Sequence, residues 1–212
     1  MYRLATTLLL AGLVGVMVGL TANTPDNPHG TPGLQDQRGF EGVGRCQTCH
    51  KKPEQGEQMR IWEESAHSKA YATLATDKAK EVAAAKGIEN PQTADECLTC
   101  HVTGHGVAAE LLGKKYSIED GVGCESCHGA GADYYKKKTM KAITAGEIDG
   151  ASVGLVAQTE EVCTQCHNED SPTFEGFCFK QRMMEIEHLD PRRERSEEEL
   201  AARRAICSPD CP

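Results

Sequence analysis

Four short segments of the chain combine two cysteines and a histidine in the pattern Cys-x-x-Cys-His. They are Cys46, Cys49 and His50; Cys97, Cys100 and His101; Cys124, Cys127 and His128; and Cys163, Cys166 and His167. Two thiols one helical turn apart can form thioethers to the two vinyl groups of one porphyrin, and the adjacent histidine then offers its imidazole to the iron. The pattern predicts four covalently attached haem c groups, each with its iron.

Zinc binding and a disulfide framework are the competing interpretations. Zinc sites also use Cys-x-x-Cys pairs, but they do not need a histidine directly after every pair. A disulfide framework has no use for that histidine either. Because all four segments carry it, the sequence favours haem attachment.

The composition fits a protein whose core is not made of side chains alone. Hydrophobic residues make up 39% of the 212 residues and aromatic residues 5%, and Trp62 is the single tryptophan. We expect four packed porphyrins to supply the missing apolar core. The formal net charge of −9 argues against a nucleic-acid-binding protein.

Histidines outside the motifs are candidates for the second axial position of each iron. Eight histidines are present, and the four that remain are His29, His67, His105 and His188. One spare histidine per iron is the number that four bis-histidine haems require, and such irons exchange electrons without an open position for substrate. Methionine is the alternative ligand, at Met59, Met140, Met183 or Met184, although methionine more often serves packing.

The rest of the chain is typical of a mainly α protein with extensive irregular loops. We predict helices over about 54–74 and 77–86, after Thr159, over 177–189 and from Ser196, where Ser196 and Glu199 form a capping-box pattern. Gly87 and Pro191 are expected to end two of them. No segment shows strand alternation, so we expect a multihaem cytochrome c fold organised around four packed haems.

The N-terminus has the features of an export signal. Arg3 precedes an uncharged apolar run from Leu4 to Leu20, and small residues follow it. We expect residues 1–22 to be a signal peptide, with an uncleaved membrane anchor as the alternative. Residues 23–44 then form a flexible arm, 45–191 a tetrahaem cytochrome c domain, and 192–212 a C-terminal helix with a cysteine-containing tail. The predicted location is periplasmic or extracellular.

Segments around the motifs resemble the tetrahaem cytochrome c-554 family, which has a cytochrome c-552/4-type domain. The resemblance lies in residues 62–70 (WEESAHSKA), 97–104 (CLTCHVTG), 121–131 (GVGCESCHGAG), 171–174 (SPTF) and 186–188 (IEH). It implies an exported, largely helical electron carrier with closely packed haems. It also implies that His67, His188 and His105 are distal ligands, whereas His29 lies in the loose arm.

One departure from the family pattern concerns the third motif. Many relatives carry a histidine shortly after its Gly-x-Gly, where this chain has Ala132, Asp133, Tyr134 and Tyr135. If His29 is not a ligand, one iron is left five-coordinate, as in some family members. Such an open iron would be the place for small-ligand chemistry, for example nitric oxide binding.

Three cysteines and a lysine run remain outside this scheme. We expect a disulfide between Cys207 and Cys211 across a Pro-Asp turn, which would leave Cys178 unpaired and buried as a small hydrophobic residue. A disulfide between chains is the weaker alternative. We expect the run Lys136–Lys138 to be solvated, although it could also meet an acidic partner or propionates.

The sequence therefore predicts an electron-transfer protein, not an enzyme, that relays electrons between donor and acceptor redox proteins through largely bis-histidine haems. Two alternatives remain open. One is a redox enzyme acting on a small nitrogen oxide or hydroxylamine at one open haem, although no Cys-x-x-Cys-Lys motif is present. The other is a self-assembling subunit of an extracellular haem filament.

Overall fold

The computed structural model describes residues 38–204. The chain divides into two compact units, Met1–Gly30 and Thr31–Pro212. The described residues all belong to the second unit, and the predicted signal segment lies outside them. Among residues 38–204, no helix is long and apolar enough to cross a bilayer.

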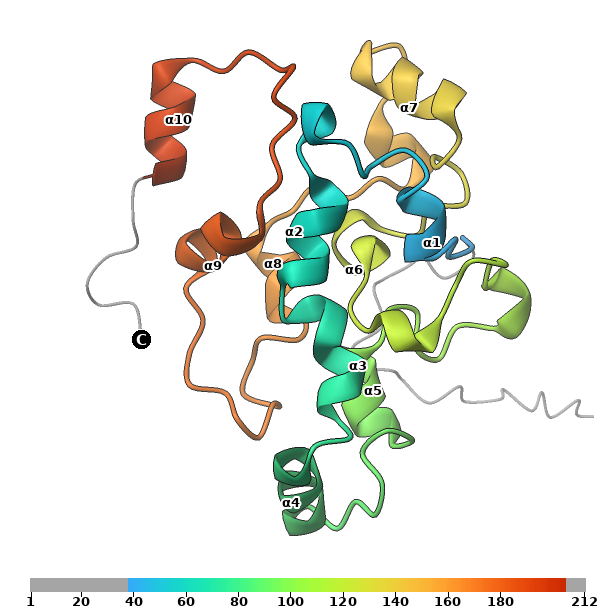
Figure 1. Cartoon of the computed structure of the whole chain (residues 1–212), viewed down its shortest axis with the longest axis vertical. Coiled ribbons are helices and arrows are strands. Elements are labelled where there is room, and N and C mark those ends of the chain that lie inside the picture. The colour runs from blue at the N-terminus through green and yellow to red at the C-terminus, as the bar shows by residue number, and fades with distance from the viewer. Residues whose placement is uncertain (1–37, 205–212) are drawn as a thin grey trace, which may run out of the picture. The chain divides into compact units, whose positions relative to one another are not determined.

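Short helices joined by irregular segments make up the described part of the chain (Figure 1). The α-helices are α1 (Val43–Cys46), α2 (Gln58–Glu64), α3 (Ala70–Thr73), α4 (Asp77–Ala85), α5 (Asp95–His101), α6 (Cys124–His128), α7 (Lys137–Thr144), α8 (Glu160–Thr164), α9 (Phe179–Ile186) and α10 (Glu197–Arg204). Single 3-10 turns are η2 (Pro53–Gln55), η3 (His67–Lys69), η4 (Ala109–Leu111), η5 (Ile118–Asp120) and η6 (Gly150–Val153). Extended pairing over 38–204 is limited to one isolated bridge between Phe40 and Leu112. The prediction of a mainly helical chain without strands is confirmed for this region.

The predicted continuous helix over 54–74 is wrong, because the structure breaks it into η2, α2, η3 and α3. Helix α2 ends at Ser65, whose backbone is extended (φ −76°, ψ 164°). Two contacts with a distant loop fix the break: the Trp62 indole N–H donates to the Val122 carbonyl (2.8 Å), and the Val122 N–H donates to the His67 carbonyl (3.0 Å). Tertiary hydrogen bonds here override the local helical preference.

The other predicted helix boundaries agree with the structure within a few residues. Helix α4 begins after Thr76, whose side chain caps the N–H of Ala79, and Gly87 follows it at φ 75°. Ser196 accepts from the N–H of Glu199 before α10 (3.1 Å). Thr159 precedes α8 as predicted, but its side chain does not cap that helix.

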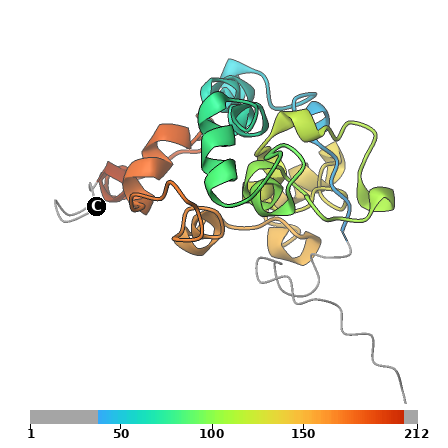
Figure 2. The ribbon, with the colours of Figure 1, turned by 90° about the horizontal axis from the view of Figure 1, so that it is seen from below.

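Helix contacts bring segments of distant sequence together. Helix α1 packs against α6, α3 against α5 and η5, and α9 against α10. Figures 1 and 2 both place the C-terminal helices, in red, across α2 and α3 from the loop that precedes α6. The apolar core over residues 38–204 is small: Leu74, Leu98 and Val102 form its buried cluster, and Tyr71 and Cys97 pack against it.

Candidate haem-binding site

All four Cys-x-x-Cys-His motifs lie on a helical turn. Helices α5 and α6 contain the whole second and third motifs, and each of the other two motifs continues the turn of a helix. In the first motif the His50 N–H donates to the Cys46 carbonyl (3.1 Å), and in the fourth the His167 N–H donates to the Cys163 carbonyl (3.0 Å). A helical turn places the two cysteines of each motif on one face, which is the arrangement that two thioethers to one porphyrin need.

The first and third motifs lie side by side. Their leading cysteines, Cys46 and Cys124, share a hydrogen bond, which raises the pKa of the Cys46 thiol and lowers that of Cys124. Burial also raises the pKa of Cys46. The contact joins residues that helices α1 and α6 carry, in agreement with the packing of these two helices.

The second and fourth motifs make a matching contact. Cys100 and Cys166 share a hydrogen bond, which lowers the pKa of Cys100 and raises that of Cys166. The pKa of Cys127, in the third motif, is raised to about 11, mainly by burial. The nearby Cys163 of the fourth motif raises it further through charge repulsion. The four motifs thus form one continuous series in the order first, third, fourth, second.

Two motif histidines lie beside a histidine from elsewhere in the chain. The ring centroids of His67 and His167 are 6.0 Å apart, and those of His128 and His188 are 5.8 Å apart. Two imidazole nitrogens that each lie about 2 Å from one metal ion place their ring centroids about 6 Å apart. Both pairs therefore have the spacing expected of two imidazoles that bind one metal ion.

Backbone carbonyls fix the tautomer of His101 and of His188. The Nδ1 atom of His101 is 2.8 Å from the Ala70 carbonyl, and that of His188 is 3.1 Å from the Ile186 carbonyl. Since a carbonyl only accepts, each Nδ1 carries the proton and each Nε2 keeps its lone pair for a metal. The Nδ1 atom of His128 lies 3.0 Å from the side-chain amide of Gln158.

Burial also keeps the imidazoles in the form that binds metals. It is the main cause that lowers the pKa of His50, His67 and His167, and it lowers the pKa of His128 to about 4, with His188 and His50 contributing. Neutral imidazole is the ligating form. The donor set of each motif, two thiols and one imidazole, therefore fits a haem c group.

Glu125, inside the third motif, holds the first motif in place, a role that its position in the sequence does not indicate. Its carboxylate is 4% exposed and accepts from the backbone N–H groups of Glu41 and Gly42 (both 2.8 Å) and of Gly131 (2.7 Å). Burial raises the pKa of this carboxyl, and the three N–H bonds oppose the shift. Residues 121–131 resemble the family pattern, but the resemblance assigns no role to Glu125.

Thr103 joins the second motif to the third. Its hydroxyl accepts from the Gly123 N–H (2.6 Å), lies 2.6 Å from the Ser126 hydroxyl and 3.2 Å from the Gly121 carbonyl. Thr103 is only 8% exposed, so these bonds are shielded from water. The short segment between His101 and Gly104 therefore orients the start of α6.

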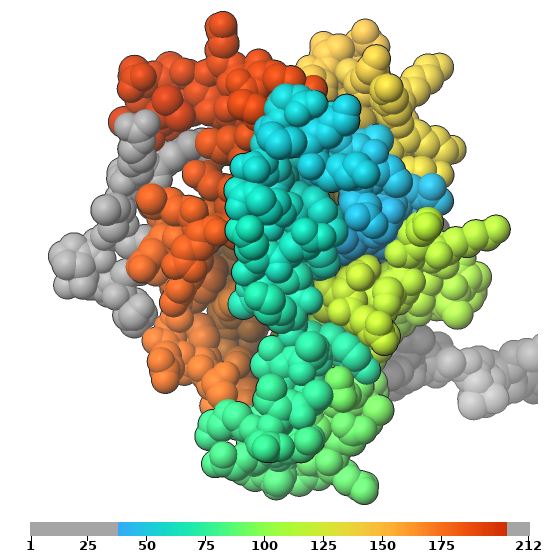
Figure 3. Space-filling view, viewed as in Figure 1, coloured from blue at the N-terminus to red at the C-terminus, as the bar shows by residue number. Residues whose placement is uncertain are grey.

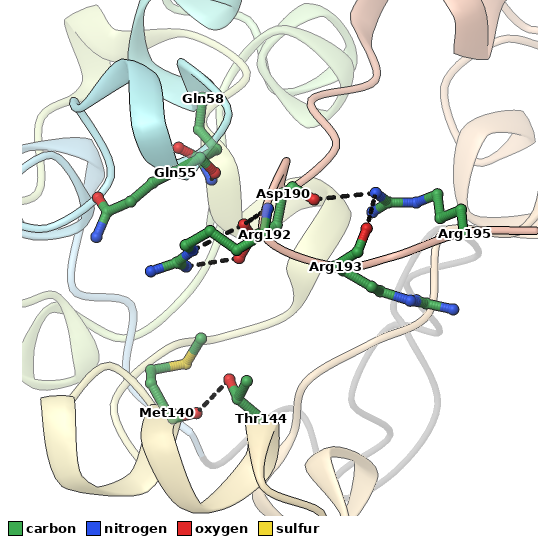
Figure 4. A network of polar contacts seen from close by, with 8 residues as sticks. All are labelled: Gln55, Gln58, Met140, Thr144, Asp190, Arg192, Arg193 and Arg195. Carbon is green, nitrogen blue, oxygen red and sulfur yellow. Dashed lines mark hydrogen bonds and ion pairs between the residues drawn. The ribbon is translucent and has the colours of Figure 1, made fainter.

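The segment after α9 forms a turn next to His188, and Figure 4 shows the contacts of Asp190, Arg192 and Arg195 in this turn. Asp190 accepts hydrogen bonds from the backbone and guanidinium of Arg192, and the Arg195 guanidinium donates to the Asp190 carbonyl (2.9 Å). A side chain at Gly56 would place its Cβ 2.5 Å from the Leu189 carbonyl oxygen, so the loop after the first motif packs directly on this turn. The loop that contains Gly56 and the turn at Asp190 thus set the position of His188.

Other predicted ligands are placed differently. The Nε2 atom of His105 is 3.0 Å from an Asp95 carboxylate oxygen, and His29 lies outside residues 38–204. The described spare histidines that form ring pairs with a motif histidine are His67, with His167, and His188, with His128; His188 also lies close enough to His50 to lower its pKa. Met184 is exposed, and Met140 lies on α7 (Figure 4).

The expectation that Cys178 is an unpaired cysteine is wrong. Cys178 is buried as predicted, at 4% exposure, but it is disulfide-bonded. The eight motif cysteines are free. Cys207 and Cys211, for which a disulfide is predicted above, lie outside the described residues.

Four motifs with this donor set, on a helical chain with few buried side chains, define a multihaem c-type cytochrome. Residues 45–129 match the family model described as cytochrome c554 and c-prime. This segment contains the first three motifs, and the match supports a c554-type cytochrome family.

Two curated relatives agree with this assignment. The chain is 33% identical over 144 residues to cytochrome c-554 of Nitrosomonas europaea, covering 60% of this chain and 57% of the relative. It is 30% identical over 92 residues to the multiheme cytochrome MtrA of Shewanella baltica, covering 41% of this chain and 27% of the relative. The chain therefore spans less than two thirds of either relative. No solved structure matches the chain.

Proposed function

We propose that this protein is an exported tetrahaem cytochrome that relays single electrons between redox proteins. The observation that carries the proposal is the continuous series of the four motifs, joined through Cys46 and Cys124, Cys127 and Cys163, and Cys166 and Cys100. Cofactors attached at such positions would lie close to one another in one chain. The N-terminal sequence supports export. Attachment of haem c and a disulfide at Cys178 support it independently, because both suit an oxidising compartment.

In this proposal the histidines of the chain hold the irons that carry the electrons. His67 together with His167, and His188 together with His128, would each hold the iron of one haem, because the paired rings have the spacing of two ligands to one metal. When bound, each haem supplies one iron that takes up or releases one electron. Hydrogen bonds to Nδ1 keep His101 and His188 oriented, and burial lowers the pKa of His67, His128 and His167, which favours their neutral form.

A second candidate function, chemistry on a small nitrogen oxide at an open iron, is supported by the placement of His105. The irons of His50 and His101 have His29 and His105 as their remaining histidine candidates, and Asp95 holds the Nε2 of His105. Ligation by His105 requires its release from Asp95. We therefore place the open coordination position, if the protein has one, at the first or second motif.

Haem stoichiometry and spin state test the proposal. A pyridine haemochrome assay on the holoprotein is expected to give four haems per chain, and a redox-titrated absorption spectrum should show at least two low-spin irons. Fewer than four haems would overturn the tetrahaem assignment. Exposure of the reduced holoprotein to nitric oxide then separates the two functions: a closed relay keeps its spectrum, whereas an open iron gives a nitrosyl spectrum.

The variant His105→Ala locates that position. If His105 is a ligand, its loss converts one more iron to the high-spin form and increases nitric oxide binding by one site per chain. If Asp95 keeps the ring away from iron, the variant has the spectrum of the wild-type protein. Asp95→Asn is the matched control, since it releases His105 without removing the imidazole.

A further inference from the structure

Four exposed lysines gather on and beside helix α7 of this acidic protein. They are Lys136, Lys137, Lys138 and Lys141, which we call the α7 lysine cluster. Residues 137 and 141 are one helical turn apart, so their side chains share a face. In Figure 3 the yellow segment that contains α7 extends side chains outward from the surface. The formal net charge of the chain is −9, so this cluster is a local exception.

The α7 lysine cluster makes no ion pair within residues 38–204. Six arginines of the same region each bind a carboxylate: Arg38, Arg45, Arg60, Arg182, Arg192 and Arg193. The acid nearest to α7 on its N-terminal side, Asp133, is paired with Arg38 (3.0 Å). The four lysine charges are therefore available to another molecule.

The cluster also opposes the stability of its own helix. Lys137 and Lys138 lie in the first turn of α7, where the helix dipole favours acids, and the N-cap residue Lys136 provides no side-chain cap. Lys137 and Lys141 are like charges at positions i and i+4, which repel each other. Residues that cost stability and make no internal contact are best explained by an intermolecular role.

The segment that carries α7 is attached at both ends to the third motif. Before the helix, the Tyr134 hydroxyl donates to the carbonyls of His128 (3.1 Å) and Gly129 (2.6 Å). After it, the Val156 N–H donates to the His128 carbonyl (2.9 Å). A partner that binds the lysines is thereby placed next to the third motif.

The same segment also contacts the first motif. The guanidinium of Arg45, which directly precedes Cys46, lies 5.2 Å from the ring centroid of Tyr135. Since Cys46 and Cys124 share a hydrogen bond, the α7 lysine cluster lies beside the pair formed by the first and third motifs. These motifs stand at one end of the proposed series.

We propose that the α7 lysine cluster is the docking surface for an acidic redox protein that exchanges electrons with the first and third haem sites. This proposal rests on the proposed electron-relay function. In each encounter the partner's redox centre gains one electron as one iron of this chain passes from ferrous to ferric, or the reverse, and no bond is made or broken.

A membrane surface fits the cluster less well than an acidic protein. A helix that binds at a bilayer surface needs an exposed apolar face beside its basic one. The large hydrophobic side chains that are exposed over residues 38–204 are Ile118 and Met184, and neither lies on α7. The net negative charge would also oppose approach to an extended anionic surface.

Charged small oxidants test the docking surface directly. The variant K137Q/K138Q/K141Q is compared with K86Q/K114Q/K180Q, which removes the same charge from three exposed lysines without carboxylate partners elsewhere on the described surface. Each reduced holoprotein is mixed in a stopped-flow instrument with the anion hexacyanoferrate(III), and separately with the cation hexaamminecobalt(III). The α7 variant is expected to react about 3- to 10-fold more slowly with the anion than the control variant does.

The expected difference has two further properties. It should vanish at about 0.5 M salt, where screening is strong, and it should not appear with the cationic oxidant. The thermal unfolding midpoint of the α7 variant should equal or exceed that of the wild-type protein, because unfavourable charges are removed. Equal rates for both variants, or a lowered unfolding midpoint, would overturn the proposal.

Two other outcomes have distinct meanings. If the wild-type holoprotein transfers electrons to neither oxidant, the electron-relay function itself fails. If the wild-type protein sediments with vesicles of phosphatidylcholine and phosphatidylglycerol and the α7 variant does not, the cluster binds an anionic membrane, and the docking proposal is overturned.

Discussion

The imidazole of His67 lies beside that of His167, with ring centroids 6.0 Å apart, although one follows the first motif and the other belongs to the fourth. His188 and His128 repeat this relationship at 5.8 Å. Each proposed iron site therefore takes its two histidines from different parts of the chain. Metal binding would then link these segments in the folded protein and add to its stability.

Replacing His67 by alanine is predicted to change the spin state of one iron. The variant His67→Ala removes the proposed second ligand of the His167 iron, so one low-spin haem should become high-spin while the thioethers keep all four haems attached. Electron paramagnetic resonance and a pyridine haemochrome assay measure these two properties on one sample. The control Lys69→Ala removes an exposed neighbour and should leave the spectrum unchanged. An unaltered low-spin count in His67→Ala would contradict the ligand assignment.

Replacing Glu125 by glutamine is predicted to destabilise the protein in a pH-dependent way. Both carboxyl oxygens of Glu125 accept hydrogen bonds from backbone N–H groups, whereas glutamine replaces one of these oxygens by an NH2 group that cannot accept. We therefore expect the free energy of unfolding to fall by about 2 kcal/mol at low pH. Burial raises the pKa of Glu125 above its ordinary value of 4.5, and the nearby Glu41 adds to the shift. The folded protein thus binds a proton that the unfolded chain has released, and wild-type stability falls as the pH rises above 4.5.

The penalty in Glu125→Gln should therefore shrink as the pH rises, because glutamine does not titrate whereas the stability of the wild-type protein falls. Urea denaturation of both holoproteins between pH 4 and 7 measures the difference. Glu147→Gln, which changes an exposed acid outside this network, serves as the control. A difference that widens with pH would contradict the expected direction of the Glu125 pKa.

The class of fold and the haem motifs could be predicted because both depend on local pattern. Cys-x-x-Cys-His needs only one helical turn, and the absence of alternation excluded strands over the described residues. The partners of Glu125 and Thr103 could not be predicted, since the N–H groups of Glu41 and Gly42 lie more than 80 residues from the carboxylate that binds them. The break at Ser65 was missed for the same reason, because the loop at Val122 causes it.

Thr103→Val is predicted to loosen the link between the second and third motifs. Valine keeps the shape of threonine but leaves the buried Gly123 N–H without its acceptor, which should cost about 1–3 kcal/mol. Thr103→Ser retains the hydroxyl and loses only a methyl group, so it should cost about 1 kcal/mol or less. Urea denaturation followed by circular dichroism compares the two. Equal losses would show that packing, and not the hydroxyl, is what matters at this position.

Gly56→Ala and Gly87→Ala separate backbone strain from displacement of the His188 segment. Both glycines have positive φ, 111° at Gly56 and 75° at Gly87, so alanine strains the backbone at either position. Only at Gly56 does the new Cβ meet another backbone, 2.5 Å from the Leu189 carbonyl oxygen; at Gly87 nothing lies within 4 Å. We expect Gly87→Ala to lose about 1 kcal/mol of stability and Gly56→Ala about 1–3 kcal/mol more.

The sharper difference between these two variants is spectroscopic. The clash at Gly56 must move Leu189, the residue after His188, so the second ligand proposed for the His128 iron shifts with it. Gly56→Ala should therefore add a high-spin fraction to the electron paramagnetic resonance spectrum of the holoprotein, whereas Gly87→Ala should keep the wild-type spectrum. If Gly56→Ala loses stability and yet retains every low-spin signal, the turn at Leu189 stabilises the fold without positioning His188, and the proposed pairing with His128 loses its structural support.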